Sequence, residues 1–309
     1  MTEYKKILII KLGALGDFIF MTGLMSAVRE KWPKAHITLM TGAGLLKLAQ
    51  ASGYFDAYLI DNRSKSPLAY FKTAKTLAYG GYDLILDFQM QRRTRQRYYA
   101  LGRLLSHKPF CWAEPKHKSL CVTQTNQKLP FMWGKSVSFD IPFSGNKPSL
   151  SFCKANPDVL KQLPQRYVLF VPGCSPAHPY KRWPSKSYQT LGKILASHHI
   201  PIVVLGTNDE KKEIEAICAD NPLAVNFCNK SALLDIPQIA DGALAVVGND
   251  TGPQHMAELS GVPAITLFAK ITACSAQKGS HITNFVGEKI EDISVDDVAC
   301  KLQFLWHKP

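Results

Sequence analysis

Short runs of branched apolar residues alternate along the first half of the chain with longer amphipathic stretches. The first run lies at 7–10, and an apolar-periodic stretch follows at 18–29 and ends before Pro33. Continuous short apolar runs are typical of strands buried on both faces, whereas periodic stretches predict helices. Further strands are predicted at 36–40, 57–60 and 83–88, and further helices at 45–51, 69–78 and 94–105.

The same alternation returns after an irregular stretch rich in Pro, Lys and Ser. It predicts strands at 167–171, 201–205, 243–247 and 264–268, helices at 187–197, 210–219 and 254–260, and a last helix at about 292–307. Strands that alternate with helices form parallel sheets covered by helices on both faces. We therefore predict an α/β protein with two Rossmann-like domains, at 1–155 and 156–309, whose parallel sheets face each other across a cleft. The last helix is expected to pack back on the first domain.

The charge of the chain is strongly basic. Its 309 residues include 37 Lys and Arg against 24 Asp and Glu, a formal net charge of +13. Such an excess attracts nucleic acid, an anionic membrane surface or a phosphorylated substrate, and does not choose among them. A nucleic-acid-binding protein should show a recognition module or a basic stripe interleaved with aromatic residues, whereas Trp and Tyr are scattered here. No apolar run approaches a membrane span, so we expect a cytoplasmic protein.

The eight cysteines give no sign of a metal or redox site. No pair has the C-x-x-C spacing, and no H-E-x-x-H occurs. The scatter predicts reduced, mostly buried thiols.

The sequence K-L-G-A-L-G-D at 11–17 joins the first predicted strand to the first helix. Ligands of open α/β sheets bind at the carboxyl ends of the strands, so this turn should border a site. Gly13 and Gly16 let a substrate approach the backbone closely. Asp17 is either an acid that the helix dipole favours or a base that accepts a proton from a hydroxyl group, and the residues alone leave both open. The spacing matches neither G-x-G-x-x-G nor a P-loop.

The segment V-V-G-N-D-T-G-P-Q-H-M-A at 246–257 also joins a strand to a helix. Asp250 or Thr251 can cap that helix. The same segment could form a phosphate cradle from the N–H groups of Thr251 and Gly252, a hydroxyl group and the imidazole of His255.

Together the two segments resemble glycosyltransferase family 9, which contains the ADP-heptose:lipopolysaccharide heptosyltransferases. Members begin with a short strand and G-x-x-G-D, and their second domain carries D-T-G-x-x-H and a G-V-P strand, matched here at 261–263. The sequences Y-D-L-I-L-D-F-Q at 82–89 and K-R-W-P at 181–184 add to the resemblance, which runs from about residue 5 to 268. It implies the two-domain architecture called GT-B, an inverting reaction, and no cofactor or metal bridging the diphosphate. The absence of a D-x-D triplet agrees with this.

The resemblance also implies roles for individual residues. Asp17 is expected to be the general base, and Lys181 to hold the phosphates of the leaving ADP with Thr251, Gly252 and His255. Further nucleotide-sugar contacts are expected from Asp250, which orients the sugar or caps the helix, and from Asp209 or Glu210 at the ribose. The acceptor is expected to be an anionic glycolipid, and the protein is expected to contact the cytoplasmic face of the inner membrane peripherally. The residues expected to contact the acceptor are Gly13, Gly16, Arg63, Lys65, Arg92, Arg93 and Arg95. The arginines at 92–97 could instead form a solvated helix face.

Two departures from the family pattern leave the substrate open. Thr22 is followed by Gly23, where relatives have Thr-Pro, and Ala269 and Lys270 stand where relatives have Gly-Pro. The second departure borders the predicted donor pocket, so the sugar or the nucleotide could differ from ADP-heptose. The alternatives are a transferase of another nucleotide sugar, a sugar-nucleotide epimerase and, less well supported, a basic nucleic-acid-binding protein.

Overall fold

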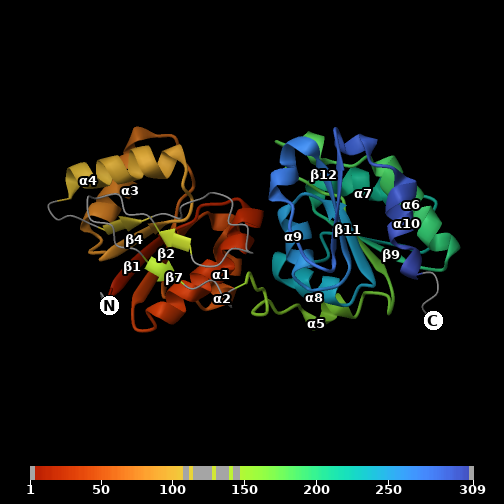
Figure 1. Ribbon diagram of the computed structural model, residues 1–309, viewed down its shortest axis with the longest axis horizontal. Helices are drawn as coiled ribbons and strands as arrows, with labels where there is room; N and C mark the ends of the chain where they lie inside the picture. Colours follow the sequence, from red (N-terminus) through yellow and green to blue (C-terminus); the bar gives the residue numbers. More distant parts are fainter. Residues whose placement is uncertain (1–3, 107–110, 114–126, 130–138, 142–146, 306–309) are drawn as a thin grey trace. The chain divides into compact units, whose positions relative to one another are not determined.

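The computed structural model describes residues 4–106, 111–113, 127–129, 139–141 and 147–305 (Figure 1). The chain divides into two compact units, Met1–Phe152 and Cys153–Pro309. What each unit binds stays a prediction, as does the packing of the last helix on the first unit.

The first unit is built on a parallel sheet in the order β3-β2-β1-β4-β5. The strands are β1 (Lys6–Ile10), β2 (His36–Thr41), β3 (Ala57–Ile60), β4 (Leu84–Asp87) and β5 (Cys111–Ala113). The helices are α1 (Leu15–Lys31), α2 (Leu46–Ser52), α3 (Pro67–Tyr79) and α4 (Ala100–Leu105), and a small antiparallel pair joins β6 (Gln127–Leu129) to β7 (Phe139–Ile141). Successive residues of a strand point to opposite faces, so β1 is buried on both sides: Leu8 and Ile10 pack in one core with Tyr70 and Leu77 of α3.

The second unit has a six-stranded parallel sheet in the order β10-β9-β8-β11-β12-β13, the strand order 3-2-1-4-5-6 of a Rossmann fold. Its strands are β8 (Val168–Val171), β9 (Ile202–Gly206), β10 (Ala224–Cys228), β11 (Ala245–Asn249), β12 (Ala264–Ala269) and β13 (Ile282–Gly287). Its helices are α5 (Pro157–Leu160), α6 (Ser185–Ser197), α7 (Lys211–Cys218), α8 (Ile236–Asp241), α9 (Gly252–Glu258) and α10 (Val295–Lys301). Helices α6, α7 and α10 cover one face of the sheet, and α8 and α9 cover the other (Figure 1).

The structure corrects several sequence expectations. The helix predicted at 94–105 is a π-helical segment, Arg93–Tyr99, followed by α4. Strands β5, β10 and β13 were not predicted; β10 and β13 are edge strands that are largely half-exposed and interrupted by asparagine, so they show no continuous apolar run.

Among the six cysteines whose side chains the structure describes, only Cys153 and Cys174 are buried, so the expectation of mostly buried thiols is wrong for these residues. None of the helices in the described ranges has the length and apolar character needed to span a bilayer.

Candidate functional site

The D-T-G segment lies between the carboxyl end of β11 and the first turn of α9. Thr251 is the N-cap of α9, and its hydroxyl accepts a hydrogen bond from the backbone N–H of Gln254 at 3.5 Å. Of the two residues able to cap this helix, Thr251 therefore does so, which leaves the carboxylate of Asp250 for other partners.

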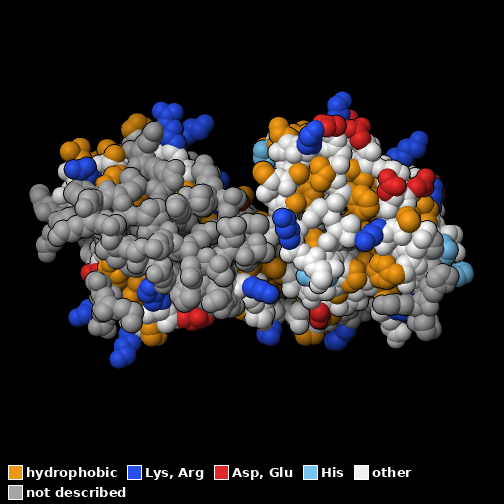
Figure 2. Space-filling model, viewed as in Figure 1, with side chains coloured by type: hydrophobic (Ala, Val, Ile, Leu, Met, Phe, Trp, Pro, Cys, Tyr) orange, Lys and Arg blue, Asp and Glu red, His pale blue; other side chains and the backbone are white. Residues whose placement is uncertain are grey.

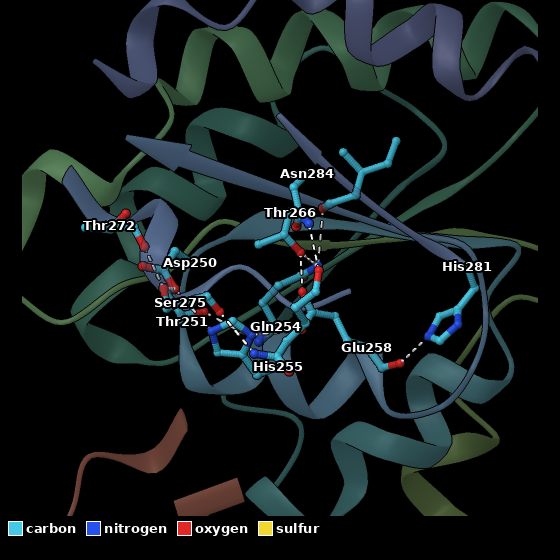
Figure 3. Close-up of polar contacts among 12 residues, drawn as sticks. Asp250, Thr251, Gln254, His255, Glu258, Thr266, Thr272, Ser275, His281 and Asn284 are labelled. Carbon is cyan, nitrogen blue, oxygen red and sulfur yellow. Dashed lines mark hydrogen bonds and ion pairs between the residues drawn. The ribbon is translucent and has the colours of Figure 1, made fainter. Parts of the chain in front are cut away.

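Asp250 lies at the centre of a cluster of polar side chains (Figure 3). One carboxylate oxygen accepts from the Lys181 ammonium at 2.5 Å, and the other accepts from His255 Nε2 at 3.1 Å and the Ser275 hydroxyl at 3.0 Å. Burial by itself would raise the pKa of Asp250, but the hydrogen bonds and charges of His255 and Lys181 lower that pKa to about 2. The group is thus a carboxylate at any physiological pH.

His255 lies on α9 between two buried carboxylates. Its Nε2 faces Asp250, and its Nδ1 lies 2.8 Å from the carboxylate of Glu258, one turn further along α9. Burial would lower the pKa of His255, but its hydrogen bonds to the carboxylates of Asp250 and Glu258 and their negative charges raise it to about 9. The ring is therefore an imidazolium at neutral pH that donates to both carboxylates. Donation to a phosphate would break one of these contacts, so that expected role stays a prediction.

Glu258 ties the cluster to the sheet. Its carboxylate accepts from the hydroxyl of Thr266 on β12 as well as from His255, and its backbone carbonyl accepts from His281 Nε2 at 2.9 Å (Figure 3). Sequence reasoning missed Glu258, although its i,i+3 spacing from His255 on a predicted helix was a usable signal. It also missed Ser275, which lies 25 residues from Asp250 along the chain and carries no such signal.

The loop that carries Lys181 is anchored by a buried asparagine. The backbone N–H of Trp183 donates to Asn249 Oδ1 at 3.2 Å, and the Tyr188 hydroxyl donates to the same oxygen at 3.0 Å. The Asn249 amide in turn donates to the carbonyl of Pro172, just after β8. Asn249 thus fixes the Lys181 loop against two neighbouring strand ends, directly beside Asp250.

Asp209 and Glu210 follow the carboxyl end of β9. Glu210 accepts from the Thr207 backbone N–H at 2.9 Å and from the Thr207 hydroxyl at 2.6 Å. It also lies against Gly173, where an added Cβ would come within 3.1 Å of the carboxylate. Asp209 is exposed. Glu210 therefore has a local structural role, and the ribose contacts of both residues stay predictions.

In the first unit, Asp17 is the third residue of α1, and no side chain caps the N-terminus of this helix. Its side chain is 60% exposed, and its carboxylate lies 3.5 Å from the ammonium of the buried Lys11. Burial lowers the pKa of Lys11, although the neighbouring Asp17 opposes this. Asp17 thus lies in the first turn of α1, where the helix dipole favours an acid. It is also exposed enough to contact a substrate, which a general base must do.

Position 13 in this turn requires a glycine. Its φ is +148°, and an added Cβ would lie 1.8 Å from the guanidinium of Arg63. The Arg63 guanidinium donates to the carbonyl of Leu12 at 2.5 Å, and Gln89 accepts from the backbone N–H groups of Leu12 and Gly13. Arg63 and Gln89 therefore hold the turn before Asp17. Gly16 lies within the first turn of α1.

Arg93 makes several polar contacts within the first unit. Its guanidinium donates to the Tyr98 hydroxyl at 2.6 Å, to the Tyr70 hydroxyl at 3.2 Å and to the backbone carbonyl of Ser64, and lies 3.6 Å from Asp61. The long side chain folds back onto the 61–64 loop, and its contact with the acceptor stays a prediction. Lys65 and Arg92 are exposed, whereas the Arg95 side chain lies outside the described part of the structure.

The sequence profile of glycosyltransferase family 9 (heptosyltransferase) matches residues 110–287, more than half of the chain. The chain belongs to this family. The lipopolysaccharide core heptosyltransferase OpsX of Haemophilus influenzae is 22% identical over 285 residues, which cover 86% of this chain and 79% of that protein.

Two solved structures share the fold of this family 9 enzyme. The glycosyl transferase family 9 protein from Veillonella parvula superposes with a TM-score of 0.70 at 15% identity, over 98% of this chain and 97% of that one. E. coli heptosyltransferase WaaC with ADP-2-deoxy-2-fluoro heptose gives 0.67 at 16% identity, over 97% and 99%. The predicted family and GT-B fold are confirmed, and the chain is a glycosyltransferase.

In this family 9 glycosyltransferase, the charge on His255 should make the fold sensitive to mild alkali. Its pKa is raised from 6.5 to about 9, so its contribution to the free energy of unfolding is full below about pH 6.5 and is lost as pH rises through about 9. We expect the free energy of unfolding, measured in urea, to fall by about 2 kcal/mol between about pH 6.5 and pH 8.5.

Glu258→Gln should lower the pKa of His255 and move this loss to lower pH. The matched control is Glu291→Gln, which removes an exposed carboxylate paired with Lys289 and should leave the pH dependence unchanged. An NMR titration of His255 measures the same pKa directly. A flat stability profile in the wild type, with His255 titrating near pH 6.5, would contradict the prediction.

Proposed function

We propose that this glycosyltransferase moves a heptose from ADP-heptose to an inner-core acceptor of lipopolysaccharide, with inversion at the anomeric carbon. The observation that carries the proposal is the contact of Lys181 and His255 with Asp250 in the D-T-G segment of a family 9 fold. The family's description, the curated relative and the WaaC complex with an ADP-heptose analogue support the same donor and acceptor classes.

On the donor side, the diphosphate competes with Asp250 for the Lys181 ammonium. Lys181 would then stabilise the negative charge that gathers on ADP as the bond to the sugar breaks, and no metal is needed for this role. Asp250 keeps hydrogen bonds from His255 and Ser275 and has an oxygen available for a sugar hydroxyl. Thr251 and Gly252 lie beside it, and Asp209 or Glu210 would receive the ribose.

On the acceptor side, Asp17 accepts the proton of the acceptor hydroxyl as its oxygen attacks the anomeric carbon. The new glycosidic bond forms on the face opposite the leaving ADP, which departs with the electron pair of the broken C–O bond. Lys11 keeps Asp17 in place through their ion pair. Basic residues of the same unit, Lys65 and Arg92 among them, would hold the anionic groups of the glycolipid.

The chain departs from the family pattern at Ala269 and Lys270, at the end of β12, and this leaves the donor open. The test therefore includes more than one nucleotide sugar. The segment Lys270–Ser275 forms 3₁₀ turns, and it brings Ser275 onto Asp250. Purified protein is incubated with ADP-heptose or another nucleotide sugar, with and without Kdo-lipid A, and the products are followed by mass spectrometry.

A heptose-sized mass increase of the lipid, only with ADP-heptose, is the expected result. Conversion of the donor without acceptor would instead identify an epimerase. Transfer from another donor would keep the transferase and discard heptose. ADP binding by calorimetry without any transfer would discard the heptosyl assignment while keeping the donor site.

A further inference from the structure

One exposed face of α3 combines large apolar side chains with lysines. Residues at positions i, i+3, i+4 and i+7 of a helix share a face, and here these are Leu68, Phe71, Lys72 and Lys75. The opposite face of α3 carries Tyr70, Ala74 and Leu77 into the core of the unit. Leu68 is 75% exposed and Phe71 49% exposed, so much of each apolar side chain faces solvent.

Helix α4 packs beside α3 and carries further exposed residues. It contributes Leu104, which is 80% exposed, and the exposed Arg103. We call Leu68, Phe71, Lys72, Lys75, Arg103 and Leu104 the α3–α4 surface. Figure 2 shows hydrophobic and basic side chains close together over these two helices, at the upper left of the first unit.

Lys72, Lys75 and Arg103 are the charged side chains of this surface, and the sequence that surrounds them is mostly basic. The sequence at 62–82 contains Arg63, Lys65, Lys72 and Lys75, and the sequence at 88–106 contains Arg92, Arg93, Arg95, Arg97 and Arg103; neither stretch contains Asp or Glu. By contrast, on the face of the second unit shown in Figure 2, the described Lys and Arg side chains stand apart from one another, and acidic side chains gather at one edge. The α3–α4 surface therefore complements an anionic partner.

We propose that the α3–α4 surface docks on an anionic lipid bilayer, with Leu68, Phe71 and Leu104 in the headgroup region and the basic side chains at lipid phosphates. Exposed Leu and Phe next to Lys are the composition of helices that lie in a membrane interface. Nucleic acid fits less well, because protruding leucines neither hydrogen-bond to phosphates nor stack on bases. This inference rests on the proposed function, in which the acceptor is an anionic glycolipid.

Docking in this way would serve the reaction through the loop before α3. That loop carries Lys65 three residues before Leu68, and Arg63, whose guanidinium contacts the turn before Asp17. An α3 helix lying in the interface holds this loop at headgroup level, where the anionic groups of a glycolipid lie. The surface thereby determines where the enzyme meets its acceptor, and the Asp17 chemistry is unaffected by it.

The test compares sedimentation of the whole protein with vesicles of phosphatidylcholine alone and with vesicles that also contain phosphatidylglycerol. We expect the wild type to bind the anionic vesicles and to be released by salt. The variant Leu68→Ser/Phe71→Ser/Lys72→Gln/Lys75→Gln should bind them at least tenfold more weakly, since each lysine near an anionic membrane contributes about a fivefold factor in affinity. The matched control, Phe304→Ser/Lys186→Gln/Lys193→Gln, removes exposed apolar and basic groups from the second unit and should bind like the wild type.

Activity on a deacylated, water-soluble acceptor separates this inference from the proposed function. The α3–α4 variant should keep wild-type activity there, which also shows that it folds, and should lose activity on vesicle-embedded acceptor. If the wild type binds anionic vesicles and the variant does not, but the wild type transfers no heptose, the proposed function is wrong and the docking surface is supported. No binding to anionic vesicles, equal binding by the variant and the wild type, or binding of duplex nucleic acid in place of vesicles would overturn the inference.

Discussion

Asp17→Asn is expected to lower the rate of glycosyl transfer by at least about 100-fold, the usual contribution of a general base. An amide has nearly the shape of the carboxylate but cannot take the proton of the acceptor hydroxyl. The Asp17 side chain is 60% exposed, and its carboxylate lies 3.5 Å from the ammonium of Lys11, so the loss of this ion pair should leave the protein folded. The rate is measured in single turnovers by mass spectrometry, and ADP binding by calorimetry should stay at the wild-type value.

The control for this variant is Glu30→Gln, which removes an exposed carboxylate from the other end of α1, where it accepts from Ser26. It should transfer at the wild-type rate. If Asp17→Asn keeps more than about a tenth of the wild-type rate, Asp17 is an acid that complements the dipole of α1 and not the base.

Lys181→Met is expected to weaken ADP binding and to reduce transfer by about 100-fold or more, because one donor to a developing charge is worth about this factor. Methionine keeps much of the length of the side chain but has no charge to place on a diphosphate. The loss should be larger in kcat/KM than in ADP affinity if Lys181 acts mainly on the leaving group. Lys181→Arg keeps the charge and should recover part of the ADP affinity and part of the transfer rate.

Lys193→Met is the matched control, since Lys193 belongs to the same unit and pairs with the exposed Asp220 at 3.7 Å. Neither ADP binding nor transfer should change in this variant. The assigned role of Lys181 is wrong if Lys181→Met binds ADP and transfers sugar as well as Lys193→Met does. Thermal unfolding of both variants distinguishes a lost phosphate contact from a lost ion pair with Asp250.

The sequence was a good guide wherever an element is buried on both faces. Strands such as β1 and β8 are continuous apolar runs because helices cover both sides, and the two loop motifs could be placed because they directly follow β1 and β11. Strand β13 could not be predicted, since an edge strand pairs on one side only and tolerates polar residues.

The partners of the site residues were much harder to predict than their positions. Lys181 and Asp250 are 69 residues apart, and Asn249 reaches the carbonyl of Pro172 across 77 residues. The contacts of Arg93 could not be predicted for the same reason, since Ser64, whose carbonyl accepts from its guanidinium, lies 29 residues away along the chain. Local sequence patterns predict where a side chain lies on its own helix, strand or loop. They do not predict which distant residues tertiary packing places in contact with it.

Both oxygens of Asp250 already accept hydrogen bonds from the protein, from Lys181 on one side and from His255 and Ser275 on the other. A ligand that engages Lys181 or Asp250 must therefore exchange one polar contact for another, so the net heat of binding should be small for the number of contacts formed. A ligand that takes the Lys181 ammonium leaves Asp250 with one contact fewer unless the same ligand also donates a hydrogen bond to that carboxylate. Under the proposed function, a nucleotide sugar carries a diphosphate for Lys181 and hydroxyl groups for Asp250, so it can satisfy both sides of the exchange and should be favoured over anions that lack such a donor.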